Sequence, residues 1–295
     1  MKIHTLDLEF QRRGTIASYL VESGSDLALV ETGPDSTWPR LRAALAELGV
    51  TPGDVRTVLV THIHLDHAGA AWRLAAEGAT VWVHPVGRPH LADPSKLLAS
   101  AKRIYRDRMD EFWGTLEPIP EDRLKVAEDG ASIRVGKAEI RVVETLGHAI
   151  HHNAYVVEGN VFTGDVGGVV IGGGPVLPPT PPPDIDLEAW RRTIDRLRAL
   201  RPDALYPTHF GRVEHPEAVL DQLGDELAAW AEFVRAGLAD GKDEAALVPE
   251  FETWATERLI AAGVGEEGRK AYRIALPFAM NVTGLVRYWQ RPAAA

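Results

Sequence analysis

VLVTHIHLDHAG, residues 58–69, is the stretch that decides the fold of this chain. Its apolar start, Val58 to Val60, is typical of a buried strand. Three histidines and an aspartate follow within six positions, in the pattern H-x-H-x-D-H. Neutral imidazoles and a carboxylate are ligands that suit zinc, iron or manganese. The stretch therefore predicts a metal site where a buried strand ends.

The spacing within this motif allows it to serve two ions. Alternate residues of an extended chain share a face, so His62 and His64 point the same way. Asp66 and His67 lie near the start of a helix that we predict over about residues 68–77. Adjacent residues point in different directions there, so the first pair could serve one ion and the second pair a neighbouring ion.

Three later residues offer the ligands that both pairs still need. His148, Asp165 and His209 each come just after an apolar stretch that reads as a strand. Open sheets gather their sites past the carboxyl ends of strands. A single histidine in such a place is more often a surface or core residue. The four-residue cluster makes a metal the better explanation, because burying those groups unpaired would be costly.

The composition of the chain excludes several kinds of catalytic site and binding partner. The chain has 295 residues, 45% of them hydrophobic, a formal net charge of −10 and no cysteine. Thiolate nucleophiles, disulfides and cysteine-ligated zinc are thereby excluded. The acidic balance gives no basic footprint for nucleic acid, and no window reaches the ~20 apolar residues that span a bilayer. We expect a cytoplasmic protein with a small-molecule substrate, no nucleic-acid partner and no membrane partner, and a homodimer is one option.

Over roughly residues 15–212 these motifs resemble the metallo-β-lactamase superfamily. Its ordered set of ligands is H-x-H-x-D-H, then His, Asp and His, which matches His62, His64, Asp66, His67, His148, Asp165 and His209. The resemblance implies an α/β fold, a four-layer αββα sandwich. It also implies that the first, second and fifth of these residues hold one ion, that the third, fourth and last hold another, and that Asp165 bridges the two beside a hydroxide.

Outside the sandwich we expect two helical additions. Residues 1–215 would form the catalytic domain, with a helical insertion over about 87–121. Residues 216–295 would form a helical C-terminal extension of about three segments, broken near Gly241 and Gly263. Lys96, Lys102, Arg103, Arg106 and Arg108 of the insertion could meet an anionic substrate, or could lie on a solvated helix face.

The resemblance implies a binuclear metal hydrolase. Two divalent ions, zinc first with iron or manganese as alternatives, would supply a bridging hydroxide that attacks an ester-type bond. Thioester, ester and lactone are the expected bonds, and a phosphodiester is less favoured. Asp66 is the expected catalytic residue, because it could take up or relay the proton after attack.

Known members of the superfamily can be partly sorted. True β-lactamases generally lack the bridging acid that Asp165 supplies here. Acyl homoserine lactonases place a tyrosine shortly after that acid, where this chain has Val166 and two glycines. Hydroxyacylglutathione hydrolase, glyoxalase II, is a nearer comparison, because it combines the full ligand set with a helical C-terminal region.

Two other readings stay open. Persulfide dioxygenases share the motif but hold one iron with two histidines and the bridging acid. A non-catalytic binding module is the third possibility. The binuclear hydrolase and the dioxygenase differ in the number of bound metal ions and in oxygen consumption. Four residues keep undecided roles at this stage: Glu31, in a turn where the superfamily often has an aspartate that orients a ligand, and His90, His151 and His152.

Overall fold

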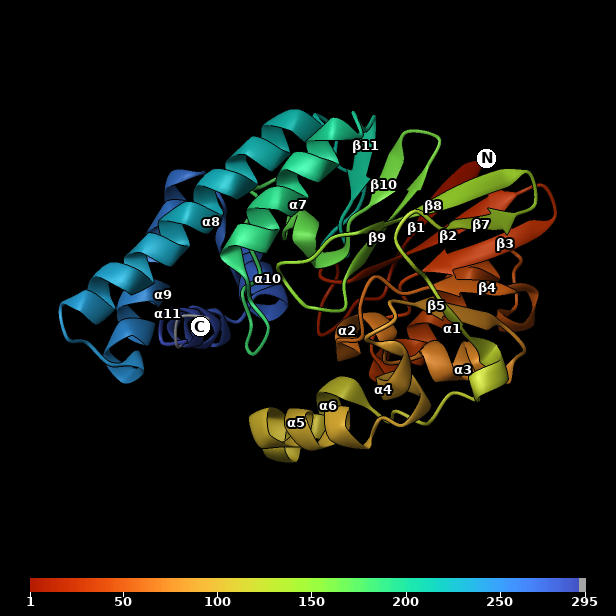
Figure 1. Cartoon of the computed structure of the whole chain (residues 1–295), viewed down its shortest axis with the longest axis horizontal. Helices are drawn as coiled ribbons and strands as arrows, with labels where there is room; N and C mark the ends of the chain where they lie inside the picture. The colour runs from red at the N-terminus through yellow and green to blue at the C-terminus, as the bar shows by residue number, and fades with distance from the viewer. Residues whose placement is uncertain (292–295) are drawn as a thin grey trace.

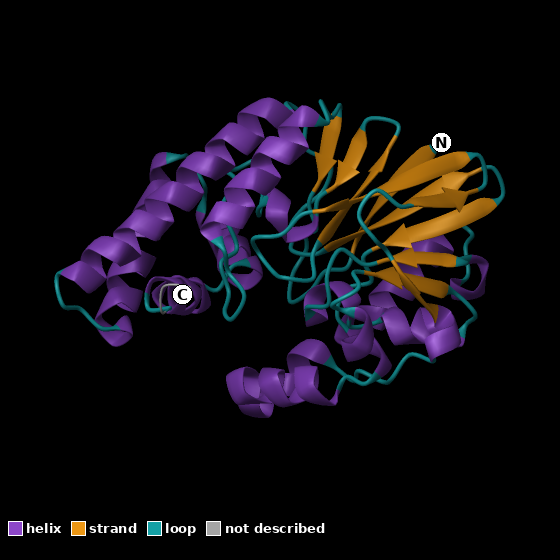
Figure 2. Cartoon of the chain, in the orientation of Figure 1, coloured by secondary structure: helices purple, strands orange, loops and turns teal. Residues whose placement is uncertain are grey.

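The computed structural model describes residues 1–291 of the chain. Two β-sheets lie face to face, with helices on both outer sides (Figures 1 and 2). The first sheet has the order β1-β2-β3-β4-β5-β6. Its strands are β1 Lys2–Asp7, β2 Ala17–Ser23, β3 Asp26–Val30, β4 Thr57–Leu59, β5 Thr80–Val83 and β6 Leu124–Val126. Strands β1 to β3 pair antiparallel, and β3 to β6 pair parallel.

The second sheet is built from the later half of the chain, in the order β11-β10-β9-β8-β7. Its strands are β7 Ser132–Val135, β8 Ala138–Glu144, β9 Asn153–Val157, β10 Asn160–Phe162 and β11 Ala204–Tyr206. Strand β8 alternates buried and exposed residues along its first half, as a strand with one covered face does. Only β10 and β11 pair parallel in this sheet; the other neighbours are antiparallel.

Three apolar cores hold the layers together. Between the sheets lie buried side chains of both, among them Tyr19 and Phe162. The first sheet packs outward on helices such as α1, Trp38–Glu47, and α3, Ala71–Ala76. The second sheet packs on α7, Leu187–Ala199, whose Asp186 N-cap accepts a hydrogen bond from the backbone of Ala189. The result is the expected four-layer α/β sandwich.

The C-terminal helices share a core with the second sheet. They are α8 Pro216–Ala239, α9 Glu244–Ala261, α10 Glu266–Ala275 and α11 Phe278–Trp289. Trp230 and Tyr272 are fully buried in that core. Four helices stand where three segments were expected, because the chain breaks again at Pro277, which cannot donate a backbone hydrogen bond within a helix. Within residues 1–291 no helix is both long and apolar enough to cross a membrane.

The insertion between β5 and β6 is helical, as expected. Its helices are α4 Arg88–Ala92, α5 Ser95–Tyr105 and α6 Met109–Trp113. In Figure 1 the yellow α5 and α6 lie at the lower edge of the picture, below the blue α10 and α11. Residues from both groups line one cavity, described below.

Candidate metal centre

The metal-ligand candidates lie at the carboxyl ends of four strands. His62 and His64 follow β4 of the first sheet. His148 follows β8, Asp165 follows β10 in the short helix η5, Gly164–Gly167, and His209 follows β11. Strand β8 is antiparallel to β9, and β9 to β10, so β8, β10 and β11 run in the same direction. Their ends therefore meet at one edge, facing the end of β4.

The remaining two candidates lie on a single helical turn. Helix α2 spans Leu65–Ala68 and is separated from α3 by Gly69 and Ala70. The expected helix over about 68–77 is therefore wrong in its start and in its continuity. An added Cβ at Gly69 would lie 2.9 Å from the Cα of Pro34, so only glycine lets the two backbone segments pack this closely. The early turn aims Asp66 and His67 toward the strand ends.

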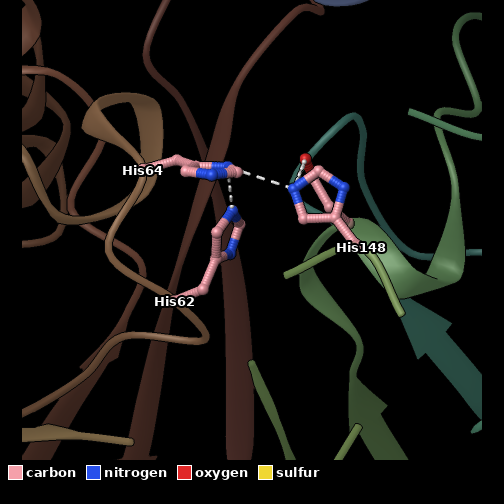
Figure 3. A group of neighbouring side chains, drawn as sticks. His62, His64 and His148 are labelled. Carbon is pink, nitrogen blue, oxygen red and sulfur yellow. Dashed lines mark hydrogen bonds and ion pairs between the residues drawn. The ribbon is translucent and has the colours of Figure 1, made fainter. Parts of the chain in front are cut away.

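Three histidines and one aspartate form the first group. His64 Nδ1 lies 2.8 Å from His62 Nε2 and 3.1 Å from His148 Nε2 (Figure 3). One oxygen of Asp165, Oδ2, lies 3.3 Å from the same His148 nitrogen. One atom from each of these side chains falls within 4.8 Å of the others, which is a spacing that a single ion could bridge.

A second group, Asp66, His67 and His209, lies beside the first. Asp66 Oδ2 is 3.6 Å from His67 Nε2 and 3.4 Å from His209 Nε2. The other oxygen of Asp165, Oδ1, turns to this group, at 3.3 Å from His67 Nε2 and 3.6 Å from His209 Nε2. All seven predicted side chains are thus brought together, and Asp165 stands between two groups. Their role as ligands stays a prediction.

Backbone carbonyls fix the protons of two histidines. His148 Nδ1 lies 2.8 Å from the carbonyl oxygen of Pro179, and His209 Nδ1 lies 2.7 Å from that of Thr15. A carbonyl only accepts, so each Nδ1 carries a proton, and Nε2 is the nitrogen left to face the other candidate ligands. Such partners orient metal-binding histidines and raise their basicity.

Glu31 does the same for His67. Its Oε2 lies 2.8 Å from His67 Nδ1, and its Oε1 accepts the backbone N–H of Thr61 at 2.8 Å. The residue is buried and has a φ of 64°, a left-handed conformation that is costly for a glutamate. This backbone lets the longer acid reach both partners. The open question about Glu31 is answered: it orients a predicted ligand.

Burial sets the charge state of the first group. It lowers the pKa of His62, His64 and His148, and neighbouring histidines lower the pKa of the first two further. Neutral imidazoles with free lone pairs are the form that binds metal. Around the second group burial opposes charge, but the facing carboxylates, Asp165 first, outweigh it and raise the pKa of His67 and of His209.

The two aspartates stay ionised. Burial opposes their charge, yet facing histidines outweigh it. His67 and His209 lower the pKa of Asp66 to about 2, and His67, His148 and His209 hold that of Asp165 well below its usual value. Among residues 1–291, His67 Nε2 and Asp165 Oδ1 are buried without a hydrogen-bond partner, although they lie 3.3 Å apart. A cation between them would satisfy both atoms. The residues present therefore fit a metal centre of histidine and aspartate ligands.

The other histidines take different places. His152 stacks on the His62 ring at 4.8 Å and lies 2.9 Å from the hydroxyl of Thr145 through Nδ1, so it supports a predicted ligand. His151 and His90 line the cavity above the site.

The cavity has a volume of about 360 Å³ and reaches the predicted ligands His64, Asp66, Asp165 and His209. The insertion and the C-terminal helices supply its walls. Of the five basic residues of the insertion considered above, only Lys96 lines it. The sequence leaves open whether the C-terminal helices line the pocket or an interface, because nothing in a helical pattern says which distant site its face will cover. In the structure residues 274–281 contribute to the cavity wall.

The comparisons with known proteins agree with this geometry. The family model of the metallo-beta-lactamase superfamily matches residues 12–209. The chain belongs to this superfamily. Its fold is similar to that of two solved superfamily structures. One, from Thermus thermophilus, has a TM-score of 0.74 at 23% identity and covers 98% of this chain and 93% of its own. The other, from Sulfolobus tokodaii, has a TM-score of 0.69 at 22% identity, covering 96% and 98%.

Two curated relatives have higher sequence identity over a smaller part of the chain. A metallo-beta-lactamase fold-containing protein of Sulfurisphaera tokodaii is 29% identical over 58% of this chain and 66% of its own length. An atrochrysone carboxyl ACP thioesterase of Aspergillus fumigatus is 28% identical over 72% of this chain and 56% of its own. The match thus spans between about half and two thirds of these relatives. The superfamily consists mostly of metal-dependent hydrolases, and this chain carries its cluster of histidine and aspartate residues.

Proposed function

We propose that the protein is a binuclear metal-dependent hydrolase that cleaves an ester-type bond, with a thioester first, then an ester or lactone. One observation carries this proposal: the two oxygens of Asp165 face two separate ligand groups, each at 3.3 Å from a histidine nitrogen. The thioesterase named among the relatives supports the choice of bond. Zinc is the proposed metal, since an all-histidine and aspartate set accepts it readily.

The residues of the chain divide the work. When bound, two divalent ions would supply a bridging hydroxide at neutral pH and polarise the substrate oxygen. His62, His64 and His148 would hold one ion, and Asp66, His67 and His209 the other, with Asp165 shared. Asp66 is partly open to the cavity and its pKa is about 2. We propose that this carboxylate, open to the cavity, relays the proton after attack.

Elemental analysis of the purified full chain, coupled to a hydrolysis screen, tests this proposal. The screen covers thioester, carboxylic ester, lactone and phosphodiester substrates. We expect two ions per chain and turnover of one of the first three bond types. One iron per chain with oxygen consumption would instead favour a persulfide dioxygenase. If the metal-loaded chain hydrolyses none of these bonds, the result would favour a non-catalytic binding module.

The seven-residue arrangement weighs against the iron alternative. A dioxygenase of that kind binds its iron with two histidines and the bridging acid, and its remaining motif residues do not coordinate metal. Here Asp66, His67 and His209 form a complete second group, and Glu31 orients one of them. The cytoplasmic location and the homodimer stay predictions from the sequence.

A further inference from the structure

The cavity above the metal centre has walls from two additions to the sandwich. Ile104 and Tyr105 come from the end of α5, Leu276 from the break between α10 and α11, and Met280 from α11. The hydroxyl of Tyr105 lies 3.9 Å from the sulfur of Met280, which joins the two walls. Four of the seven metal-ligand candidates line the same cavity, so a substrate bound there can place its reacting bond at the site and its remainder between these helices.

The interior of this cavity is strongly apolar. Tyr105 packs edge-on against Trp113 at 4.9 Å between ring centroids, and Trp113 stacks on Phe10 at 5.5 Å. All three residues line the cavity. Aromatic and aliphatic walls favour a ligand that removes its own apolar surface from water.

The mouth of the cavity is apolar as well. Val86, Ile104 and Ile150 come from separate segments, and they are 43%, 48% and 51% exposed, although large hydrophobic side chains are rarely left open together. All three line the cavity. Isolated exposed residues of this kind need no explanation, but three around one opening mark a surface that an apolar ligand covers.

The charges around the cavity do not suit an anionic ligand. Lys96 is the only lysine or arginine that lines it among the described residues, and Asp184 lies on the same lining. These opposite charges offer no clamp for a carboxylate or phosphate, which proteins usually hold with arginine. The part of an ester substrate that contacts these walls should therefore be uncharged.

We propose that the space between α5 and α10–α11 binds the uncharged, extended apolar acyl group of the substrate, and so selects long-chain acyl thioesters or esters over short ones. This inference rests on the proposed hydrolase function. In a thioester the acyl group is the apolar half, whereas thiol carriers are polar, which places the acyl side against these walls.

A chain-length series tests the inference on the metal-loaded full chain. The substrates are acyl thioesters of N-acetylcysteamine from acetyl to decanoyl, together with an octanoyl analogue that carries a terminal carboxylate. Burial of one methylene stabilises by ~0.8 kcal/mol, so kcat/KM should rise about fourfold per methylene until the cavity is filled. The carboxylate analogue should lose most of the gain of octanoyl over acetyl.

Two aspartate variants supply a matched comparison. Ile104→Asp puts a charge at the cavity mouth, and Ile260→Asp puts one at an equally exposed residue of α9 that does not line the cavity. In the first variant the octanoyl-to-acetyl ratio of kcat/KM should fall at least about tenfold, the loss of roughly two methylene contacts. In the second the ratio should stay that of the parent. Circular dichroism checks that both fold.

Calorimetry adds a readout apart from turnover. Octanamide should bind with a negative heat-capacity change, the mark of buried apolar surface, and Ile104→Asp should weaken it. A flat or falling acyl series, preference for the carboxylate analogue, or dependence on the thiol side alone would overturn the acyl assignment while leaving the hydrolase intact. Failure to hydrolyse any bond in the screen would instead overturn the proposed function, and this inference with it.

Discussion

Asp165 is the residue on which the two ligand groups depend, because its two oxygens face different histidines. Asp165→Asn keeps the shape but removes the charge and one ligand oxygen. We expect bound metal to fall from two ions toward one or none and kcat/KM to fall by at least about 100-fold, since even residues behind the ligands cost 10–100-fold. Elemental analysis and turnover measure both effects.

Asp129→Asn is the control for that substitution. Asp129 pairs with Arg196 at 2.7 Å on the surface, and its side chain is 45% exposed. Exposed pairs contribute little, so this variant should keep its metal and activity. An Asp165→Asn protein with full metal content and full turnover would contradict the bridging role.

Glu31 can be tested through the proton on His67. In Glu31→Gln the amide oxygen can still accept from Thr61, but the amide N–H₂ then faces His67 Nδ1 and makes it an acceptor. The imidazole proton moves to Nε2, where it blocks the lone pair that faces Asp165. We expect a 10–100-fold loss of metal affinity, measured by competition with a chelating dye.

A second glutamate–histidine pair provides the comparison. Glu22 lies 3.2 Å from His4 at the surface, far from the strand ends that carry the site. Glu22→Gln should leave metal affinity unchanged. Equal affinities in the two variants and the parent would mean that Glu31 does not set the tautomer of His67.

Two helices each contain a glycine in their interior, but the space around the two glycines differs. An added Cβ at Gly284 of α11 would overlap the backbone of Thr180 and Pro181, next to the carbonyl that orients His148. Gly284→Ala should therefore lower the free energy of unfolding by about 1–3 kcal/mol, as overpacking does, and weaken metal binding. Urea unfolding and metal titration measure these changes.

Gly224 of α8 is the matched helical glycine, with no heavy atom of the described residues within 4 Å of an added Cβ. Gly224→Ala should stabilise by roughly 0.5–1 kcal/mol through helix propensity alone. A Gly284→Ala protein as stable as Gly224→Ala would show that α11 does not seat closely on the 179–183 segment.

The elements also show what the sequence could predict. The sequence predicted that His148, Asp165 and His209 lie just past the ends of strands, and the structure has them there. This position could be predicted because each residue closely follows its strand along the chain. The break at Pro277 follows a local proline signal that the expectation of three segments overlooked. The cavity wall at Met280 could not be predicted, since it depends on how distant helices pack. The use of Nδ1 by His64 and the left-handed backbone of Glu31 likewise arise only when the two halves of the fold meet.

At the scale of the molecule, the candidate centre lies where two halves with separate cores meet. The candidate ligands His62, His64, Asp66 and His67 come from the half that forms the first sheet, and the other three candidates come from the half that forms the second. The outer cores of these halves are distinct clusters. Metal bound by ligands of both halves would therefore link them across the edge of the sandwich.

Removal of metal should consequently destabilise the whole fold and not only the site. Ligand at 100 times its Kd stabilises by ~2.7 kcal/mol, which for a chain of this size corresponds to roughly 5–10 °C in Tm. Chelation of the loaded protein should lower Tm by about that amount, and the chelator should leave Tm of a His64→Ala, Asp165→Asn double variant almost unchanged, because that protein has little metal to lose. If chelation strips the ions and Tm stays constant, the two halves are held by their apolar contacts alone and the centre adds chemistry without stability.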